Sequence, residues 1–283
     1  MVSARLRSIA RSVLPPFIVQ WLRPRTVGSV AVQVMPPRMV DVEGGPLRGA
    51  RLLLDVTRQA FREMRDGTYD AFVWSTLPPL NENGAVVDIG AHIGYTTLAF
   101  AALYPDRQVF AFEPNPVNLE RFRSNIGLNP VLGQRIAVHQ AALGNDNGEV
   151  VFHSSGNVDD ETSSGGHVDG ITPPLDAGIY AKAGFRAFTV PMRRLDELVQ
   201  EGGWGRIALM KIDVEGAEHL VLEGASNTLR TDRPVLSIEV HSVSCMLALI
   251  NILQPLDYEV RMVHEHRPSR AHIVAAPRTH TQH

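Results

Sequence analysis

Acidic side chains at the ends of short apolar runs are the residues of this sequence best suited to chemistry. Asp88, Glu113, Asp213 and Glu239 each stand at or near the end of a run rich in Val, Ile, Leu and Phe, and His241 follows the last of these runs. A carboxylate can accept hydrogen bonds from two neighbouring hydroxyls, and a histidine can take up a proton near neutral pH. These residue types predict hydroxyl binding and proton transfer, provided that the fold brings them together.

The first of these runs leads into a turn that contains two glycines. Residues 86–89 are β-branched apart from Asp88, Gly90 and Gly94 follow, and residues 95–100 have the pattern of a helix. Glycine lets the backbone approach a ligand closely, and the start of a helix offers free N–H groups to a carboxylate or phosphate. The pattern predicts a strand, a tight turn and a helix that bind a cofactor through Asp88, Gly90, His92, Gly94, Tyr95 and Thr96.

Glu113 indicates which kind of cofactor this turn would bind. It follows Asp88 by 25 positions, and an acid near this spacing can accept both hydroxyls of a ribose. The G-x-G-x-x-G spacing that seats a dinucleotide pyrophosphate is absent, because Gly90 and Gly94 are four positions apart with His92 between them. S-adenosylmethionine, whose amino-acid end is zwitterionic, fits this looser loop. A nicotinamide-dependent oxidoreductase and a non-catalytic nucleoside-binding module are the two alternatives.

The elements that would position these residues alternate between strands and helices. Strands joined by helices predict an α/β fold with a doubly wound, mostly parallel sheet, and such sheets bind ligands beyond the carboxyl ends of their strands. In that arrangement Asn115, in the turn after Glu113, and Ala142, at the end of the third strand, would lie near the nucleoside. We expect strands at residues 86–89, 107–112, 136–142, 207–213, 234–241, 258–263 and 272–276, the last two antiparallel.

Three blocks of the sequence, at residues 87–97, 112–116 and 211–218, are more specific than the rest. The last block, Lys-Ile-Asp-Val-Glu-Gly-Ala-Glu, is the most specific of the three. Together they resemble the FkbM family of S-adenosylmethionine-dependent methyltransferases, with one departure at His92, where that family more often has Asn. The resemblance covers about residues 84–241. It implies a seven-stranded sheet of the class I methyltransferase (Rossmann-like) type and O-methylation of a sugar, glycolipid or polyketide-type small molecule.

Methyl transfer to an oxygen requires an acceptor hydroxyl that is held in line with the sulfonium and loses its proton. We predict that Asp213, Glu215 and His241 are the catalytic residues, because they lie at or after strand ends. His241 has the pKa range best suited to a base at neutral pH. The predicted contacts to the acceptor are Glu239, Ser163 and Ser164.

A divalent metal on Asp213, Glu215 and Glu239 is an alternative use of these carboxylates. We do not favour a metal, because carboxylates at strand ends also bind ribose or cap helices. Glu218 is expected to stabilise the dipole of the helix that it begins. Lys211 is expected to reach the edge of the sheet or to pair with an acid.

The sequence divides into a basic, mostly helical N-terminal extension, residues 1–80, and a methyltransferase domain, residues 81–283. Residues 52–76 are expected to form one or two helices, whose Tyr69 could approach the ligand, although the core is the commoner place for such an aromatic residue. Residues 153–186 are rich in Gly, Ser, Asp and Pro, and a loop of that length predicts a lid or binding loop. We interpret it as the acceptor loop.

Composition narrows the choice of partners. The 283 residues are 44% hydrophobic and 20% charged, as in ordinary globular proteins, and the net charge of −3 gives no electrostatic case for nucleic acid. The single cysteine, Cys245, fits a reducing cytoplasm and a core position. Residues 2–14 form an amphipathic, arginine-containing stretch that could pack on a protein surface, touch a membrane or be a transit peptide. We expect a cytoplasmic monomer or homodimer that acts on a small-molecule or glycolipid acceptor.

Overall fold

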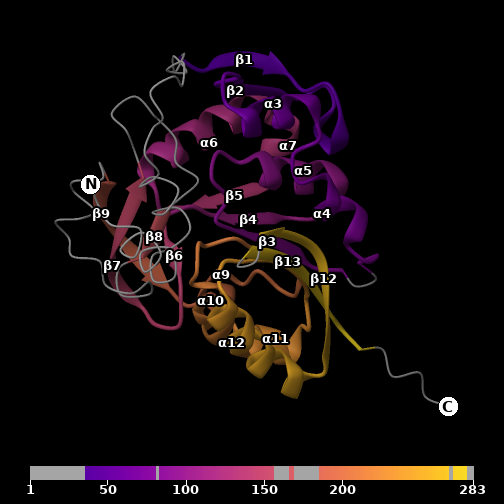
Figure 1. Cartoon of the computed structure of the whole chain (residues 1–283), viewed down its shortest axis with the longest axis vertical. Helices are drawn as coiled ribbons and strands as arrows, with labels where there is room; N and C mark the ends of the chain where they lie inside the picture. Colours follow the sequence, from indigo (N-terminus) through magenta and orange to yellow (C-terminus); the bar gives the residue numbers. More distant parts are fainter. Residues whose placement is uncertain (1–35, 81–82, 156–165, 169–184, 268–269, 279–283) are drawn as a thin grey trace, which may run out of the picture.

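A central sheet with helices on both faces forms the body of the molecule (Figure 1). The computed structural model describes residues 36–80, 83–155, 166–168, 185–267 and 270–278. The order of the strands in this sheet is β12-β13-β11-β10-β3-β4-β5. Five of them are parallel, and β13 is antiparallel to both of its neighbours. The predicted doubly wound, mostly parallel seven-stranded sheet is confirmed.

The strand order reverses at the centre of this sheet. Strand β3 (Ala85–Ile89) continues through α5 to β4 (Val109–Phe112) on one side, and β10 (Ile207–Ile212) lies on its other side. Ligands of such sheets bind where the strand order reverses, beyond the carboxyl ends of the strands. The remaining strands are β5 (Ile136–His139), β11 (Val235–Val240), β12 (Tyr258–Arg267) and β13 (Arg270–Pro277).

Two groups of helices cover the two faces of this sheet, as Figure 1 shows above and below it. Apolar side chains of the strands share hydrophobic clusters with both groups. Val86 clusters with Phe100 of the first group, and Val87 clusters with Leu222 and Leu249 of the second. Both faces are therefore buried, as expected for strands that are apolar throughout. The helices are α5 (Tyr95–Leu103), α6 (Pro116–Leu128) and α7 (Pro130–Gly133) on one face, and α9 (Leu195–Gly202), α10 (Glu218–Gly224), α11 (Ser226–Thr231) and α12 (Val243–Leu253) on the other, with a 3-10 turn η2 (Gln254–Leu256).

A second, four-stranded sheet lies beside the central one, with the order β6-β9-β7-β8 (Figure 1). Its strands are β6 (Ala142–Leu143), β7 (Gly148–Ser155), β8 (Gly166–Val168) and β9 (Phe185–Arg193). The prediction of a structureless loop over residues 153–186 is wrong at β8, which pairs antiparallel with β7. Short polar and glycine-rich stretches can still join a ladder, because the hydrogen bonds come from the backbone.

The part of the chain before the central sheet differs from its prediction. Residues 52–54 were expected to be helical, but they lie in β2 (Arg51–Leu54), which pairs antiparallel with β1 (Arg38–Asp41). Burial alternates along β2, since Leu52 and Leu54 are buried and Arg51 is exposed. The β2 backbone donates hydrogen bonds to the side chains of Asn125, in α6, and Asn129, the residue after α6. Three consecutive leucines thus follow a period of two. The helices expected here are α3 (Gln59–Asp66) and α4 (Ala71–Thr76), with a 3-10 turn η1 (Gly45–Leu47).

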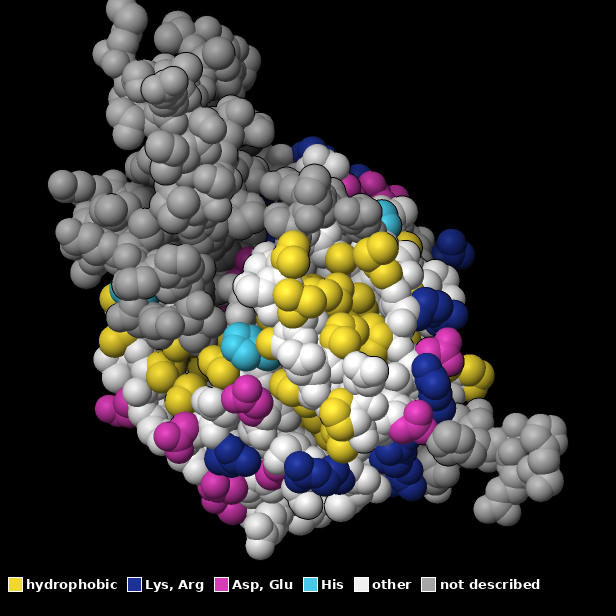
Figure 2. All heavy atoms as spheres, turned by 60° about the horizontal axis from the view of Figure 1, so that its bottom comes forward, with side chains coloured by type: hydrophobic (Ala, Val, Ile, Leu, Met, Phe, Trp, Pro, Cys, Tyr) yellow, Lys and Arg dark blue, Asp and Glu magenta, His cyan; other side chains and the backbone are white. Residues whose placement is uncertain are grey.

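One face of the molecule carries a group of hydrophobic side chains (Figure 2). Val243 and Leu247 of α12 are 63% and 62% exposed, although Cys245, Leu249 and Leu253 of the same helix are buried.

Of the helices in the described part of the chain, none has both the length and the apolar character needed to cross a membrane.

Candidate active site

A cleft opens beyond the carboxyl ends of β3, β4 and β10, where the strand order reverses. It has an empty volume of about 920 Å³, including the space open to solvent. Loop residues after these three strands, strands of the second sheet and residues from α3 and the start of α4 all contribute to its walls. The predicted site residues that line it are Gly90, His92, Tyr95, Thr96, Glu113, Ala142, Asp213 and Glu215.

Close contact between two strand ends forms the floor of this cleft. Gly90 has a φ of +82°, and a Cβ atom there would lie 1.8 Å from the backbone oxygen of Asp213. Only glycine fits this position, because a side chain would collide with the backbone of the neighbouring strand. The Asp213 N–H donates to the Ile89 oxygen at 3.0 Å, which joins the ends of β3 and β10.

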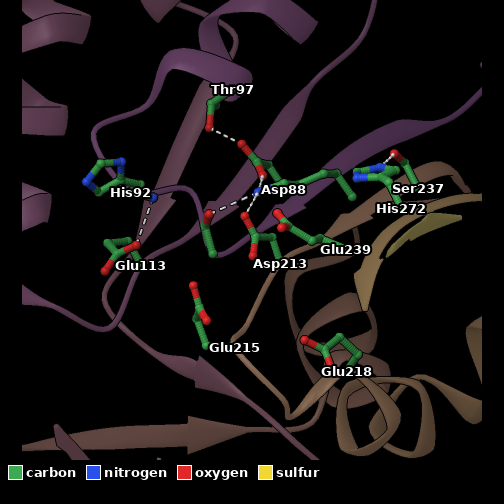
Figure 3. A network of polar contacts seen from close by, with 12 residues as sticks. Asp88, His92, Thr97, Glu113, Asp213, Glu215, Glu218, Ser237, Glu239 and His272 are labelled. Atoms are coloured by element: carbon green, nitrogen blue, oxygen red, sulfur yellow. Dashed lines mark hydrogen bonds and ion pairs between the residues drawn. The ribbon is translucent and has the colours of Figure 1, made fainter. Parts of the chain in front are cut away.

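Three hydrogen bonds hold Glu113, at the end of β4, and Figure 3 shows the one from His92. Its carboxylate accepts from the His92 N–H at 2.8 Å, from the Asn115 N–H at 2.9 Å and from the Asn118 side chain at 3.2 Å. Burial raises the pKa of Glu113 to about 7, although these donors and Lys211 act in the opposite direction. A preoriented carboxylate at this point can accept hydrogen bonds from the hydroxyls of a sugar ring.

Asp88 lies beneath the cleft and does not line it, in contrast to its predicted role as a direct cofactor ligand. Its side chain is 0% exposed, accepts from the Thr97 hydroxyl at 2.6 Å and pairs with the Lys211 ammonium at 3.5 Å (Figure 3). Successive side chains of a strand point to opposite faces, and Ile89 is the residue of β3 that faces the cleft. Asp88 therefore stabilises the α5 start and the Lys211 side chain from within the core.

Lys211 joins the acids of β3 and β10. Its Nζ lies 3.5 Å from Asp213 Oδ2 as well as 3.5 Å from Asp88 Oδ1, and it donates to the Gly90 oxygen at 3.1 Å. The predicted pairing of Lys211 with an acid is thereby confirmed. Burial opposes ionisation of Asp213, but Lys211, His241 and Arg270 outweigh burial and lower the pKa of Asp213 to about 2. Asp213 is consequently an ionised carboxylate in the cleft wall.

His241 lies next to the cleft but does not line it, and its surroundings contradict the prediction of a neutral-pH base. Its Nδ1 lies 2.6 Å from Glu218 Oε1, and its Nε2 lies 3.3 Å from Glu215 Oε2 and 3.6 Å from Asp213 Oδ1. Burial alone would lower the pKa of His241, but Glu215, Glu218 and Asp213 raise it to about 10. A histidine with that pKa already holds its proton at neutral pH.

Glu218 begins α10, as predicted, but its side chain also has partners that the sequence did not predict. Its side chain is fully buried, and besides His241 it accepts from the Cys245 thiol at 2.7 Å and from the Gly216 N–H at 2.9 Å. Burial disfavours the ionised Glu218 carboxylate, but the hydrogen bond from His241 and the positive charge of His241 lower the pKa of Glu218. Glu218 thus fixes the orientation of the imidazole, and Cys245 is a buried thiol, as predicted, with a polar partner.

Glu239 and Arg270 complete this group of charges on the side away from Glu113. Arg270 Nε lies 2.8 Å from Glu239 Oε1, and Arg270 Nη2 lies 2.9 Å from Glu215 Oε1 and against His241 Nε2. Burial and Asp213 raise the pKa of Glu239 to about 8. Among the described residues, Asp213, Glu239 and His241 offer ligand atoms within 4.8 Å of one another, the spacing of a metal site. The Arg270 guanidinium already contacts two of these three residues.

Two predicted contacts, Gly94 and Asn115, do not line the cleft. Gly94 is not in the cleft wall but begins α5 with a φ of +86°, where a Cβ would meet the Phe122 ring at 2.1 Å. Asn115 begins α6, accepts from the Val117 N–H and donates to Ser154, so it also supports the cleft from outside. Ser163 and Ser164 fall outside the described residues.

Other residues of the cleft were missed by the sequence interpretation. Met64, Asp70, Phe152 and Val168 line it, and Tyr69, which was predicted mainly for the core, lines it too. Asp70 and Met64 belong to the segment before the central sheet, and Phe152 and Val168 belong to the second sheet. No motif marks them, because tertiary packing alone brings these segments to the cleft. Asp70 alone had a local signal, an acid directly before the helix of residues 71–76.

Comparisons with known proteins agree on one family. The family model of the methyltransferase FkbM domain matches residues 88–261, more than half of the chain. The 2-O-methyltransferase NoeI of Sinorhizobium fredii is 33% identical over 150 residues, which cover 52% of this chain and 60% of NoeI. The chain thus spans less than two thirds of the length of that relative.

Two further relatives match over longer regions. The 31-O-demethyl-FK506 methyltransferase FkbM of Streptomyces tacrolimicus is 30% identical over 224 residues, which cover 71% of this chain and 83% of that protein. The hexuronic acid methyltransferase AglP of Haloferax volcanii is 27% identical over 211 residues, which cover 74% of this chain and 76% of AglP.

Proposed function

The chain belongs to the FkbM methyltransferase family, and we propose on this premise that it transfers a methyl group from S-adenosylmethionine to a hydroxyl oxygen of a small molecule. One observation carries the proposal. Glu113 and Asp213, from the ends of two different strands, face the same cleft at the point where the strand order reverses. One acid is placed for the ribose and the other for the reacting end of the cofactor.

The walls of the cleft fit the parts of this cofactor. Glu113 can accept the ribose hydroxyls, and the apolar wall formed by Ala141, Ala142, Leu143 and Phe152 suits the adenine. The opposite end, near Gly90 and the start of α5, offers backbone N–H groups to the methionine carboxylate. Two buried polar atoms of the cleft-lining residues, the Tyr95 hydroxyl and His92 Nε2, have no partner among the described residues, as expected where a ligand supplies one.

The acids near β10 would position the acceptor. S-adenosylmethionine supplies an electrophilic methyl group, and the protein must hold a hydroxyl in line with it. We infer that Asp213, which is ionised and lines the cleft, accepts the hydrogen bond of the acceptor hydroxyl and takes its proton as the bond to carbon forms. His241 and Arg270 hold Asp213 in place as positively charged neighbours, while Glu215 and Glu239 are further candidates to contact the acceptor.

Relatives indicate the class of the acceptor. NoeI is named as a 2-O-methyltransferase, AglP as a hexuronic acid methyltransferase, and the Streptomyces tacrolimicus relative as an enzyme that methylates 31-O-demethyl-FK506. The proposed acceptor is therefore a sugar, a glycolipid or a polyketide-type molecule. Exposed Val243 and Leu247 lie on α12, which begins directly after His241, and an apolar surface there suits a lipid-linked acceptor. Peripheral membrane contact through the N-terminus and the absence of a nucleic-acid partner stay predictions.

Calorimetric titration of the purified protein tests the cofactor first. S-adenosylhomocysteine should bind, and NAD should not; binding of NAD alone would favour an oxidoreductase. Incubation with methyl-labelled S-adenosylmethionine and fractionated cell extract, followed by mass spectrometry, should then reveal an acceptor with one added methyl group. Cofactor binding without label transfer to any hydroxylated compound would favour a nucleoside-binding module.

A further inference from the structure

We propose that Asp70, from the segment before the central sheet, binds the α-ammonium group of the methionine portion of the cofactor. The proposal rests on the cofactor assignment above and extends it to a residue outside the region matched by the family model, which begins at residue 88. It commits to a cationic ligand group at the end of the cleft away from the adenine. No sequence motif pointed to this role.

Asp70 has an unusual position at the start of a helix. It is the residue before α4, where an aspartate normally accepts a hydrogen bond from the helix backbone, but its side chain makes no such bond. Its backbone has a φ of 49° and a ψ of 31°, the left-handed region that residues other than glycine adopt only at a cost. Asp70 therefore has a strained backbone conformation, and its side chain does not cap the helix.

Asp70 instead lines the cleft. The structure shows no hydrogen bond or ion pair of this carboxylate with any described residue. Burial raises its pKa to about 6, with Asp213 adding to the effect and Lys211 opposing it, which places Asp70 among the charges at the β10 end. A half-buried carboxylate without a partner is costly unless a ligand supplies one.

Tyr95 provides an independent sign of a ligand at the same place. Its side chain is 2% exposed and lines the cleft, and its hydroxyl has no partner among the described residues. Asp70 lines the same cleft as Tyr95, and after burial it contributes to raising the pKa of Tyr95. The Tyr69 ring packs edge-on against Tyr95, with ring centroids 5.6 Å apart, and closes this space from the side.

The charges of this end select a cation over an anion. Asp70 and Asp213 both line it, while the described cations near Asp70, Lys211 and Arg270, already contact acids. An ammonium group beside Asp70 would supply the partner that this carboxylate lacks among the described residues. Glu113 marks the ribose position, and the apolar wall at 141–143 takes the adenine, so the methionine portion is the part of the cofactor that reaches Asp70.

Two ligands that differ only in the amino-acid portion test this assignment. S-adenosylhomocysteine carries the ammonium group, and 5′-methylthioadenosine lacks the amino-acid portion altogether. Calorimetry should show that Asp70→Asn weakens the affinity for S-adenosylhomocysteine at least about tenfold, because a charge-assisted hydrogen bond is lost. The affinity for 5′-methylthioadenosine should stay unchanged. Asp66→Asn, an exposed change at the end of α3, is the matched control and should affect neither ligand.

A second variant separates binding from folding. Asp70→Gly removes the carboxylate but suits the left-handed backbone, so its Tm should equal or exceed that of the wild type while the same selective loss of S-adenosylhomocysteine appears. The proposal would be overturned if the wild type and both variants bound S-adenosylhomocysteine with equal affinity. It would also be overturned if the variants lost affinity for both ligands to the same extent. Lower turnover with unchanged S-adenosylhomocysteine affinity would assign Asp70 to the acceptor and also overturn it. Failure of the wild type to bind either ligand would instead remove the proposed function itself.

Discussion

Glu113 links cofactor binding to pH at the level of a single residue. Its pKa is raised to about 7 by burial, so the free protein carries a mixture of neutral and ionised Glu113 near neutral pH. Ribose hydroxyls donate to the ionised form, so binding should favour loss of the proton. The affinity for S-adenosylhomocysteine should rise by up to about tenfold per pH unit below pH 7 and level off above it.

Calorimetry across this pH range, with Glu113→Gln as the variant, checks the assignment. The glutamine cannot ionise, so the affinity of this variant should be weaker and should not change between pH 7 and 8, whereas Asp70, with a pKa of about 6, keeps its own effect at lower pH. Glu120→Gln, an exposed change on α6, should retain the wild-type profile. A wild-type affinity that stays flat over the same range would show that Glu113 does not bind the cofactor as an ionised acid.

His241 is expected to act through Asp213 and not as the base itself. Replacing it by alanine removes the positive charge 3.6 Å from Asp213 Oδ1 and the contact that orients this carboxylate. We expect turnover by His241→Ala to fall by about 10²-fold, with the affinity for S-adenosylhomocysteine nearly unchanged, as misplacement of a reacting group would cause. Steady-state kinetics should show wild-type turnover in His264→Ala, an exposed control. Equally fast turnover in both variants would exclude His241 from the mechanism.

The position of Arg270 predicts that turnover does not require a divalent metal ion. Its guanidinium contacts Glu239, Glu215 and His241, and so supplies the positive charge that a divalent ion would otherwise bring to these residues. Turnover should therefore persist after dialysis against EDTA, and Mn²⁺ should not raise the Tm of the protein. Activity that disappears with EDTA and returns with Mg²⁺ or Mn²⁺ would show that the Asp213, Glu239 and His241 group binds a metal.

Residue types in the sequence indicated which acids cluster, but not which of them reach the cleft. Asp88 and Glu113 both stand at strand ends, yet Glu113 lines the cleft and Asp88 turns into the core toward Thr97. The alternation of side chains along β3 decides this, and a one-residue uncertainty in the strand end reverses the outcome. The environment of His241 depends on Arg270 and Glu218, which are far apart in sequence.

At the scale of elements, the turn between β3 and α5 depends on Gly90. Alanine there would place a Cβ 1.8 Å from the Asp213 oxygen and separate the ends of β3 and β10. Gly90→Ala should reduce the free energy of unfolding by at least about 2 kcal/mol and weaken cofactor binding. Chemical denaturation and calorimetry would measure the two effects. A Gly90→Ala variant with the stability and cofactor affinity of the wild type would contradict the close packing of these strand ends.

Gly127 provides the matched glycine within a helix. It lies inside α6, and a Cβ there would meet nothing within 4 Å. Gly127→Ala should therefore increase the free energy of unfolding by about 0.5 to 1 kcal/mol, because alanine favours the helix, and leave cofactor affinity unchanged. If the Gly127→Ala variant were less stable than the wild type, the room for a Cβ atom would not be enough to explain the difference between Gly90 and Gly127.

The strands of the central sheet were predictable because each is a short apolar run that ends in a turn signal. Residues 52–54 were not, since three leucines in a row fit a helix and a strand equally, and the Asn125 and Asn129 contacts favour the strand. Strand β8 is equally hidden, because Gly166–Val168 carries no apolar pattern and forms only through pairing with β7. Local sequence identifies elements with strong periodicity, and tertiary contacts determine the others.

At the scale of the whole molecule, three separate parts of the chain build one cleft. The central sheet supplies Glu113 and Asp213, the second sheet supplies Phe152, and the segment before the sheet supplies Tyr69 and Asp70. The alternating strands and helices made the doubly wound topology predictable from the sequence. Closure of the cleft by the other two parts was not predictable, because it depends on how surfaces pack and not on any motif.

A crystal structure of the protein with S-adenosylhomocysteine tests the central claim most directly. The account predicts the ribose hydroxyls within hydrogen-bond distance of the Glu113 carboxylate, the adenine against Ala141–Leu143 and the sulfur facing Asp213. A nucleoside bound outside this cleft, or bound with its ribose away from Glu113, would contradict it.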